Sequence, residues 1–214
     1  MNGIFITFEG PDGAGKTSVM EEIVAILRDQ VMIDIVETRE PGGIPIAEEI
    51  RQLILDNKNV MMDERTEALL FAAARRQHLV EKINPALHAG KLVINDRFVD
   101  SSLAYQGKGR RIGMEEVAQL NEFVTEGLKP DLTLYLDIDA ETGLKRAGKV
   151  AGGNDRLEAE GIEFHQRVRH GYIELLQKEG DRIVKVDAKQ PFEQVVTECY
   201  HIIRERFPSI FRNY

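Results

Sequence analysis

One segment near the N-terminus has the residue types and spacing of a phosphate-binding loop. It reads GPDGAGKT and fits the pattern G-x-x-x-x-G-K-S/T. Glycines let backbone N–H groups turn inward around phosphate oxygens, and a following helix N-terminus adds a favourable dipole. We expect Lys16 to reach the β- and γ-phosphates of a nucleotide and the Thr17 hydroxyl to bind Mg²⁺. The predicted phosphate ligands are Gly10, Pro11, Asp12, Gly13, Ala14, Gly15, Lys16 and Thr17.

Two polar segments follow apolar runs, where strands of a parallel sheet are expected to end. Residues 39–43 read REPGG and include Glu40, and Asp96 and Arg97 close the run Leu92–Asp96. Ligands of doubly wound folds bind at this carboxyl edge. An aspartate there can hold Mg²⁺ directly or through water, and an arginine can bind a phosphate. Taken alone, the first segment also fits a simple turn and the second a surface ion pair.

A long predicted helix, Asp63–Ala89, carries charge on its apolar face. On a helical wheel one apolar arc holds Ala68, Leu69, Phe71, Ala72, Leu79, Val80 and Ile83. Arg75 and Arg76 fall inside this arc, although a solvated charge belongs opposite it. Phe71 and Arg75 are i,i+4 neighbours, so an aromatic face and a guanidinium can line one base-binding pocket. A core role for Phe71 and a snorkelling Arg75 are the alternatives.

Polar residues just after Arg97 have a similar spacing. Ser101 and Tyr105, and Ser102 and Gln106, are i,i+4 pairs if this segment is helical. They offer a polar wall opposite the helix of Phe71. Alone, they also fit an ordinary polar helix turn.

The elements that must position these residues alternate between short apolar strands and longer helices. We expect strands at Ile4–Phe8, Ile33–Thr38, Leu92–Asp96, Leu132–Asp137 and Ile183–Asp187. We expect helices at Lys16–Gln30, Pro45–Leu55, Asp63–Ala89, Val99–Tyr105, Met114–Glu126, Ala140–Ala147, Ile162–Glu179 and Pro191–Phe207. This order indicates an α/β fold with a doubly wound parallel sheet covered on both faces.

The composition bounds the class of protein. The 214 residues suit one domain, 1–214, and 43% hydrophobic against 30% charged residues is an ordinary globular balance. A net charge of −8 (28 − 36) gives no general electrostatic surface for a nucleic acid polymer. Apolar runs too short for a membrane span, no signal peptide and a single cysteine predict a soluble cytoplasmic protein.

The segment 148–161 differs from the rest of the chain. It reads GKVAGGNDRLEAEG, with four glycines, five charges and almost no large apolar group. We expect a mobile lid within the domain and not a domain boundary.

A phosphate-binding loop leaves several classes of protein open, among them small-molecule kinases, GTPases and motor-type ATPases. A GTPase is expected to contain a guanine-reading N-K-x-D segment, which is absent from this sequence. Arginines beside glycines suit a second anionic substrate and favour a kinase. The alternatives are a kinase for a different small acceptor and a nucleotide-dependent switch that transfers no phosphate.

Several motifs together resemble the thymidylate kinase family, and its bacterial members in particular. They are FEGPDGAGKT, TREPGG, LLFAAARRQHL, DRFVDSSLAYQG, PDLTLYLD and DRLE, in the family's order and spacing over nearly the whole chain. The resemblance implies a five-stranded parallel sheet of the P-loop NTPase type and a homodimer. It also implies the reaction ATP + dTMP → ADP + dTDP with Mg²⁺, on the route to dTTP.

The resemblance also implies roles for residues in the nucleotide site. Phe71 stacks on thymine, Arg75 binds the 4-oxo group, and Ser102 and Gln106 complete the base contacts. Because guanidinium only donates hydrogen bonds, we expect strong rejection of dCMP. The thymine methyl is one buried group, so we expect dUMP to be a weaker acceptor.

The sugar and phosphate contacts follow in the same way. Arg97 is expected to bind the dTMP phosphate, helped by Arg39 or Arg51, and Glu40 is counted with the substrate-binding residues. Asp12 is expected near the 3′-hydroxyl and the acceptor phosphate. Tyr105 is expected to press against the sugar where a 2′-hydroxyl would sit.

The positive charge that assists phosphoryl transfer comes from different segments in the two branches of the family. One branch of the family has an arginine inside the phosphate loop, but the variable positions here read PDGA; the other branch uses a basic lid. We expect Arg156 to close over the phosphates as a catalytic residue, with Arg146 or Lys149 assisting. The alternative is that Arg156 pairs with Glu158 or Glu160 and orders the lid.

Overall fold

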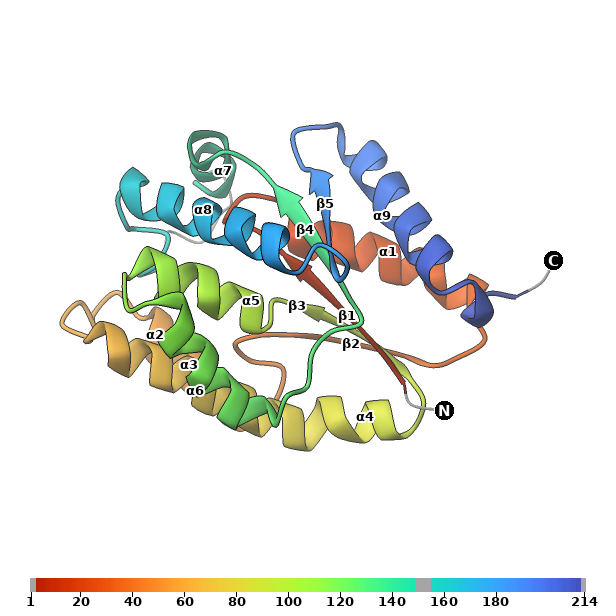
Figure 1. Cartoon of the computed structure of the whole chain (residues 1–214), viewed down its shortest axis with the longest axis horizontal. Coiled ribbons are helices and arrows are strands. Elements are labelled where there is room, and N and C mark those ends of the chain that lie inside the picture. Colours follow the sequence, from red (N-terminus) through yellow and green to blue (C-terminus); the bar gives the residue numbers. More distant parts are fainter. Residues whose placement is uncertain (1–2, 149–154, 213–214) are drawn as a thin grey trace.

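Five parallel strands form the centre of the computed structural model, which describes residues 3–148 and 155–212. Within those ranges the sheet order is β2-β3-β1-β4-β5 (Figure 1). The strands are β1 (Ile4–Glu9), β2 (Ile35–Arg39), β3 (Leu92–Asp96), β4 (Leu132–Asp137) and β5 (Ile183–Asp187). The three central strands are almost fully buried, as expected for apolar strands covered on both faces. The predicted doubly wound α/β fold is confirmed.

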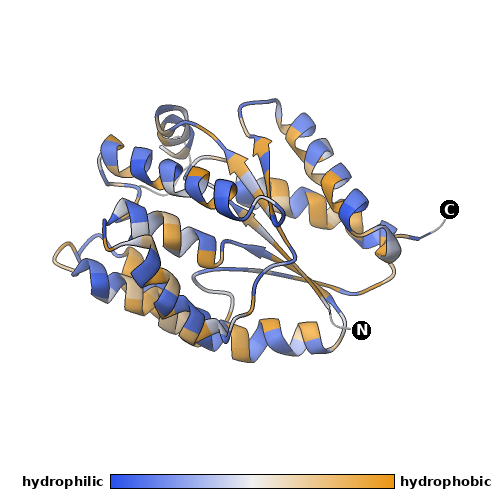
Figure 2. Ribbon diagram, viewed as in Figure 1, coloured by the Kyte–Doolittle hydropathy of each residue, from blue (hydrophilic) through white to orange (hydrophobic). Residues whose placement is uncertain are grey.

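Helices cover both faces of this sheet. They are α1 (Lys16–Gln30), α2 (Pro45–Leu55), α3 (Glu64–His78), α4 (Asn84–His88), α5 (Val99–Ser102), α6 (Met114–Thr125), α7 (Ala140–Ala147), α8 (Ile162–Lys178) and α9 (Phe192–Arg206), with π-helical turns η1 (Leu79–Ile83) and η2 (Leu103–Gly109) and a 3-10 turn η3 (Pro208–Ile210). Helices α1 and α9 pack with β1, β3 and β4 in the main core, and α8 and η1 pack on the other face. Figure 2 shows mainly hydrophobic strands and helices that alternate hydrophobic and hydrophilic residues.

Most limits agree with the predicted elements to within a residue or two. Strand β2 begins at Ile35 and not at Ile33, because its pairing with β3 begins opposite Leu92. Strand β1 continues to Glu9, which pairs with Tyr135 of β4. The longer β1 matters because it places the Glu9 carboxylate at the carboxyl edge of the sheet.

The predicted helix Asp63–Ala89 is one helical path of three parts. Asp63 caps its start and accepts hydrogen bonds from the N–H groups of Arg65 and Thr66, both at 3.0 Å. The π-helical turn η1 directly precedes α4, whose first turn contains Pro85. Proline has no N–H group for a helical hydrogen bond, so the wider turn accommodates it.

The predicted apolar arc of this helix is rotated. Leu69 and Val80 are 57% and 47% exposed, whereas Glu67 and His78 are fully buried. Helix α3 packs against α2 on one side and α6 on the other, and its small residue Ala72 is buried among them. The buried face therefore includes charged side chains, which hydropathy alone assigns to the surface.

The predicted helix Val99–Tyr105 is also different in detail. It is α-helical to Ser102 and then continues as the π-helical turn η2 to Gly109. The wider turn buries both Tyr105 and Gln106. π-Helical turns are often found at functional sites because they redirect side chains.

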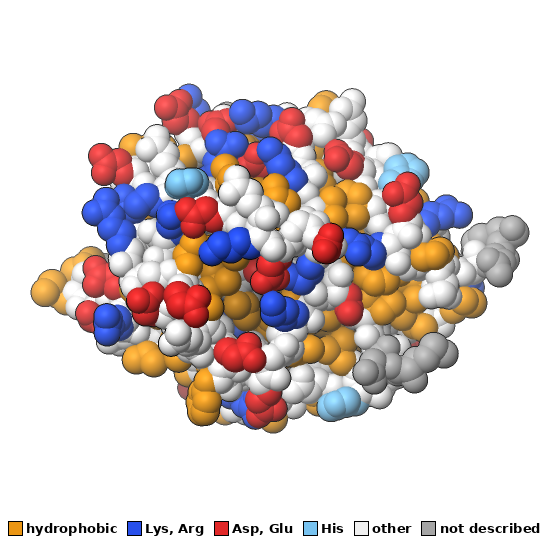
Figure 3. Space-filling view, viewed as in Figure 1, with side chains coloured by type: hydrophobic (Ala, Val, Ile, Leu, Met, Phe, Trp, Pro, Cys, Tyr) orange, Lys and Arg blue, Asp and Glu red, His pale blue; other side chains and the backbone are white. Residues whose placement is uncertain are grey.

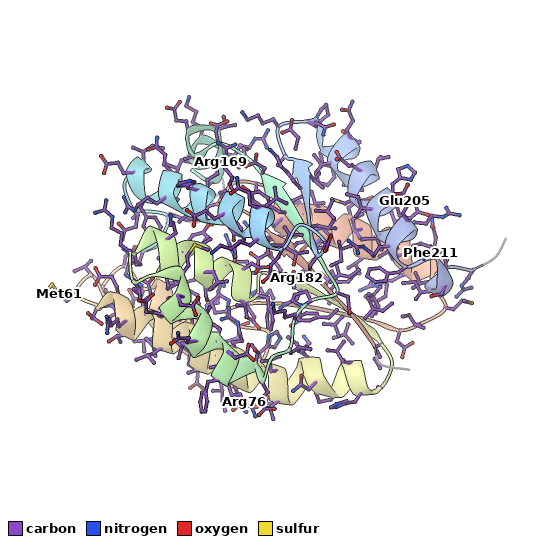
Figure 4. The ribbon with its side chains drawn as sticks, viewed as in Figure 1. Met61, Arg76, Arg169, Arg182, Glu205 and Phe211 are labelled. Atoms are coloured by element: carbon purple, nitrogen blue, oxygen red, sulfur yellow. The ribbon has the colours of Figure 1, made fainter. Side chains whose placement is uncertain are left out.

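The surface is mixed in charge. Figure 3 shows Lys, Arg, Asp and Glu side chains interspersed over the visible face. Met61, in the loop after α2, points outward at the edge of the molecule and is 92% exposed (Figure 4). In the described part of the chain, no helix has the length and apolar character that crossing a membrane requires.

Candidate active site

The loop Gly10–Thr17 joins the end of β1 to the start of α1, as a phosphate-binding loop requires. Gly10, Gly13 and Gly15 have φ angles of 143°, 75° and 82°, which favour glycine. A Cβ atom on Gly13 would lie 1.9 Å from the backbone oxygen of Gly143, so no side chain fits there. The backbone therefore turns tightly in front of the N-terminus of α1, where an anion is stabilised.

The Lys16 side chain is buried within this loop. Its Nζ atom donates a hydrogen bond to the backbone oxygen of Pro11 at 2.9 Å. Burial, followed by the charge of Arg97, lowers the pKa of Lys16 to about 8. A buried ammonium group with one carbonyl partner is stabilised by a nearby anion. The place and charge of Lys16 therefore suit a nucleotide phosphate.

Thr17 and Asp96 meet where β3 ends beside the start of α1. The Thr17 hydroxyl donates to Asp96 Oδ2 at 2.5 Å, and Asp96 Oδ1 is buried without a hydrogen-bond partner among the described residues. Oxygen ligands of this kind suit Mg²⁺, which usually shares its shell with water and substrate phosphates. Residues 3–148 and 155–212 hold no group of three acidic, His or Cys side chains placed for a metal. The residues present fit Mg²⁺ that is bound together with a nucleotide.

Asp12 and Arg97 form an ion pair between the loop and the end of β3. Arg97 Nη2 lies 2.5 Å from Asp12 Oδ1, and the Tyr105 hydroxyl donates to Asp12 Oδ2 at 2.8 Å. Burial raises the pKa of Asp12, but Arg97 and then Lys16 outweigh it and hold that pKa below its usual value. Arg97 has a φ of 69°, a rare conformation outside glycine that is found at functional positions.

Glu9 anchors the turn that follows Arg97. The Glu9 carboxylate accepts hydrogen bonds from the Phe98 N–H and the Ser101 hydroxyl, both at 2.6 Å, and from the Tyr172 hydroxyl at 2.8 Å. Arg97 Nη1 in turn donates to Ser101 Oγ at 3.1 Å. The buried Glu9 carboxylate thus fixes Phe98 and Ser101, and Ser101 in turn contacts Arg97.

A cavity of about 600 Å³ connects the phosphate-binding loop to α3. Its lining includes the loop residues Asp12 and Lys16 and the metal candidates Thr17 and Asp96. It also includes all the predicted base-site and sugar-site residues, namely Phe71, Arg75, Ser102, Tyr105 and Gln106. The structure therefore brings residues from four separate segments of the sequence to one cavity.

Arg75 is a buried cation of this cavity whose side chain is 2% exposed. Its Nε donates to Glu40 Oε2 at 2.7 Å, its Nη1 to Ser102 Oγ at 3.1 Å and to Asn121 Oδ1, and its Nη2 to the Phe98 carbonyl at 3.0 Å. These bonds use four of the five N–H groups of a guanidinium. One Nη2 N–H group remains, which suits a single acceptor atom on a ligand.

Glu40 and His78 form a chain of buried hydrogen bonds that ends at Arg75. Glu40 was expected among the substrate-binding residues, and it lines the cavity. Its second oxygen, Oε1, lies 3.1 Å from His78 Nδ1, and His78 Nε2 lies 2.7 Å from Thr38 Oγ1. If His78 donates to Glu40, its other nitrogen accepts from Thr38, so every member of the chain has a partner.

Arg39 and Arg51 line the same cavity. Arg39 forms an exposed ion pair with Glu48 at 2.7 Å, and Arg51 Nη1 donates to the carbonyl of Pro41 at 3.0 Å. To the residues that the structure describes, Arg51 makes no other side-chain hydrogen bond, which leaves N–H groups for a ligand. Both residues are placed to assist Arg97 with an anionic ligand.

Arg156 is not at the expected place. It does not line the cavity: its guanidinium binds Glu67 Oε2 at 2.5 Å and the Ile54 carbonyl at 2.9 Å. Among the described residues it has no ion pair with Glu158 or Glu160, so the alternative partners were wrong, whereas closure over bound phosphates stays a prediction. The physical reason is the buried Glu67 carboxylate, a stronger partner than a half-buried lid carboxylate.

The other two predicted lid cations differ from each other. Arg146 lines the cavity, and its Nη1 donates to the Ala188 carbonyl at 2.7 Å. Lys149 lies outside the described residues. No role was predicted for Arg76. Its side chain donates to the Val124 carbonyl at 3.2 Å and pairs with Glu126 at 2.9 Å, at the C-terminal end of α6 (Figure 4).

Sequence reasoning missed several polar residues around the cavity. They are Glu9, Glu67, His78 and Asn121, all buried and all in contact with predicted site residues. A signal existed for two of them: on the helical wheel Glu67 and His78 fall beside Phe71, on the side away from Leu69. Charged positions at helical spacing next to a predicted pocket indicate buried polar contacts.

Comparisons with known proteins agree on one family. The family model described as thymidylate kinase matches residues 8–199. The thymidylate kinases of Enterococcus faecalis and Latilactobacillus sakei are 61% and 62% identical to this chain over 212 residues, covering 99% of it and 100% and 99% of the relatives. The crystal structure of the Ehrlichia chaffeensis thymidylate kinase has a TM-score of 0.77 and 33% identity, covering 95% of this chain and 99% of that one. With its phosphate-binding loop and base-site residues around one cavity, the chain belongs to the thymidylate kinase family.

Proposed function

We propose that this chain transfers the γ-phosphoryl group of ATP to dTMP and releases ADP and dTDP. The observation that carries the proposal is the shared cavity, in which a phosphate-binding loop faces a base site built from Phe71, Arg75 and Gln106. The ion pair of Asp12 and Arg97 lies between the two ends. Two nucleotides bound at these ends direct their phosphates toward each other.

The chemical step requires few covalent partners from the protein. An oxygen of the dTMP phosphate attacks the γ-phosphorus of ATP, and the bond between that phosphorus and the β–γ bridging oxygen breaks. The acceptor phosphate is ionised at neutral pH, so we assign no general base. The residues Lys16 and Arg97 contribute positive charge and orientation, which supply most of catalysis in phosphoryl transfer.

Metal binding completes the charge arrangement. We propose that Thr17 and Asp96 hold Mg²⁺, the former through its hydroxyl and the latter through the oxygen that has no other partner. Bound Mg²⁺ offsets negative charge on the nucleotide phosphates. The hydrogen bond from the Thr17 hydroxyl to the other carboxylate oxygen, Asp96 Oδ2, holds the two side chains together.

The base site supports thymine as the preferred base. Phe71 offers an aromatic face for stacking, and the remaining N–H of Arg75 suits the 4-oxo group. A cytosine amino group at that position would face a donor. Asp12 and Tyr105 are proposed to contact the sugar, where Tyr105 leaves no room for a 2′-hydroxyl.

We assign further positive charge at the transferred phosphoryl group to the lid, 148–161, which belongs to the single domain 1–214. We propose that Arg156 exchanges Glu67 for the phosphates when both nucleotides are bound, with Arg146 assisting from the cavity wall. Closure of such a segment excludes water, which would otherwise accept the phosphoryl group. The cytoplasm is the proposed site of this reaction.

We further propose that two copies associate through the outer face of α2, α3 and α6. This face exposes large apolar side chains, among them Phe123 at 85% and Leu69 at 57%. Large apolar side chains exposed on one face favour a protein partner over water. Sedimentation of the wild-type protein is expected to show a dimer, and Phe123→Glu is expected to yield monomers.

An acceptor panel tests the activity. ADP release is measured with ATP and Mg²⁺ against dTMP, dUMP, dCMP, ribothymidine monophosphate, AMP, GMP and no acceptor. We expect fast turnover with dTMP, weaker turnover with dUMP and little with dCMP. ATP binding with no acceptor turned over would support a nucleotide-dependent switch and reject the kinase.

A further inference from the structure

The direction of hydrogen bonding by Gln106 decides which base its side chain accepts. A glutamine amide has a donor arm and an acceptor arm of nearly equal shape. Thymine presents an N–H donor at N3, where cytosine presents an acceptor. The base site therefore distinguishes them at N3 only if one arm of the amide is held toward the cavity.

Glu67 is the residue that holds this amide. The Gln106 Nε2 group donates to Glu67 Oε1 at 2.9 Å, and both side chains are buried. A carboxylate accepts hydrogen bonds and donates none, so only the NH₂ arm of Gln106 can face it. Gln106 Oε1 makes no hydrogen bond to any residue in the described ranges, and the residue lines the cavity. The acceptor arm is thus the one available to a ligand.

Two arginines keep Glu67 in this orientation. Arg110 donates to Glu67 through Nε at 3.2 Å and Nη2 at 3.1 Å, and Arg156 donates through Nη2 at 2.5 Å. Guanidinium groups are donors only, so they compete with Gln106 for Glu67 but cannot reverse the direction of its bond. Charge-assisted bonds of this kind are roughly twice as strong as neutral ones. The two Arg110 bonds do not depend on Arg156, so they hold the Glu67 carboxylate also when Arg156 moves to the phosphates.

We propose that Glu67 is a positioning residue for base specificity: it presents the acceptor arm of Gln106 to the cavity. The cavity wall then offers one hydrogen-bond acceptor, Gln106 Oε1, and one donor, the remaining Nη2 N–H group of Arg75. This pattern complements the N3–H and 4-oxo groups of thymine and opposes both groups of cytosine. The inference rests on the proposed function and adds the residue that sets the hydrogen-bond pattern.

The test is the ratio of kcat/KM for dTMP to kcat/KM for 5-methyl-dCMP. These acceptors share the 5-methyl group and differ only at N3 and C4. In Glu67→Gln the Gln106 amide can turn and offer its NH₂ arm to cytosine N3. We expect the ratio to fall about 10- to 100-fold, the worth of one buried hydrogen bond made or left unmet.

The matched control is Glu160→Gln. Glu160 also binds Arg110 but does not contact Gln106, so this variant removes the same charge from the same cluster. We expect its ratio to equal that of the wild-type enzyme. An unchanged ratio in Glu67→Gln, or an equal fall in Glu160→Gln, would overturn the inference. A wild-type enzyme that does not phosphorylate dTMP would instead reject the proposed function.

A double variant separates hydrogen-bond direction from general loosening of the site. In Glu67→Gln with Gln106→Glu, the pair exchanges its groups, and a carboxylate oxygen again faces the cavity as an acceptor. We expect this variant to recover most of the selectivity ratio, whether or not the single variant folds. A double variant that folds and remains unselective would show that Glu67 does not act through the direction of this bond.

Discussion

Replacing Glu9 with glutamine is expected to change how the stability of the protein depends on pH. Glu9 is fully buried, and burial, followed by the charge of Asp100, raises its pKa from 4.5 to about 7. The Phe98 and Ser101 hydrogen bonds act in the opposite direction and are outweighed. The folded protein therefore binds a proton at Glu9 more tightly than the unfolded chain does.

The sign and size of the effect follow from linkage. Between pH 4.5 and about 7 the folded state carries more protons at this site than the unfolded state, so stability falls as pH rises. The stabilising contribution of protonated Glu9 is complete below pH 4.5 and is lost as pH passes through about 7. The full difference is about 3 kcal/mol, and about 2 to 3 kcal/mol of it falls between pH 5 and 8.

Glutamine isolates this contribution because it keeps the contacts. Its oxygen can accept from the Phe98 N–H, and its NH₂ group can donate to the hydroxyls of Ser101 and Tyr172, which lie 2.9 Å apart and can exchange roles. Urea unfolding of the wild-type protein and Glu9→Gln without nucleotide, at about pH 5, 6, 7 and 8, gives the difference in unfolding free energy. We expect this difference to shift in favour of the variant by about 2 to 3 kcal/mol over that range.

The control for this experiment is Glu141→Gln, which removes a carboxylate from an exposed position of α7. Titrating groups that do not interact with Glu9 are common to all three proteins and cancel in the differences. A stability difference between wild type and Glu9→Gln that stays constant with pH would refute the reasoning. It would mean that Glu9 ionises in the folded protein as it does in the unfolded chain.

Three further predictions concern the substrate site. Phe71→Ala is expected to raise the dissociation constant of dTMP by about 5- to 150-fold, the worth of one base–aromatic stack, and calorimetry that finds unchanged affinity would contradict the stacking role. The kcat/KM for dUMP is expected to be about 10- to 200-fold below that for dTMP, and no detectable dUMP turnover at high enzyme concentration would count against it. Arg156→Ala is expected to lower kcat about 100- to 1,000-fold if it contacts the transferred group, whereas near-normal turnover would leave it only its contact with Glu67.

The parts of the site that are contiguous in sequence could be predicted well. The loop Gly10–Thr17 needs only its own glycines, the strand before it and the helix after it, and all three are local properties. The same holds for Asp96 and Arg97, because the end of an apolar strand marks the carboxyl edge of a parallel sheet. Five of the base-site and sugar-site residues followed from resemblance and helical spacing, and the structure brings them to one cavity.

Partners that are distant in sequence could not be predicted in this way. Arg156 binds Glu67, 89 residues away, and Arg75 binds Asn121, 46 residues away. Hydropathy placed the buried face of α3 toward Leu69, because it treats charge as a mark of solvent. The actual face is selected by Glu40 after β2, Gln106 of η2 and Asn121 of α6, which are among the partners that make buried charge tolerable.

The buried glutamates explain how an acidic chain can hold a site for two anionic nucleotides. Lys16 shows what burial costs a cation without a carboxylate partner among the described residues: burial lowers its pKa to about 8, so its charged form is less stable than that of an exposed lysine. Arg75 avoids that cost through Glu40, and the two arginines at Glu67 share one carboxylate. Glu40 lines the cavity, but its two oxygens are held by Arg75 and His78, whereas Glu67 does not line the cavity. Arg75 thus keeps an N–H group for a base oxygen inside a chain whose net charge is −8.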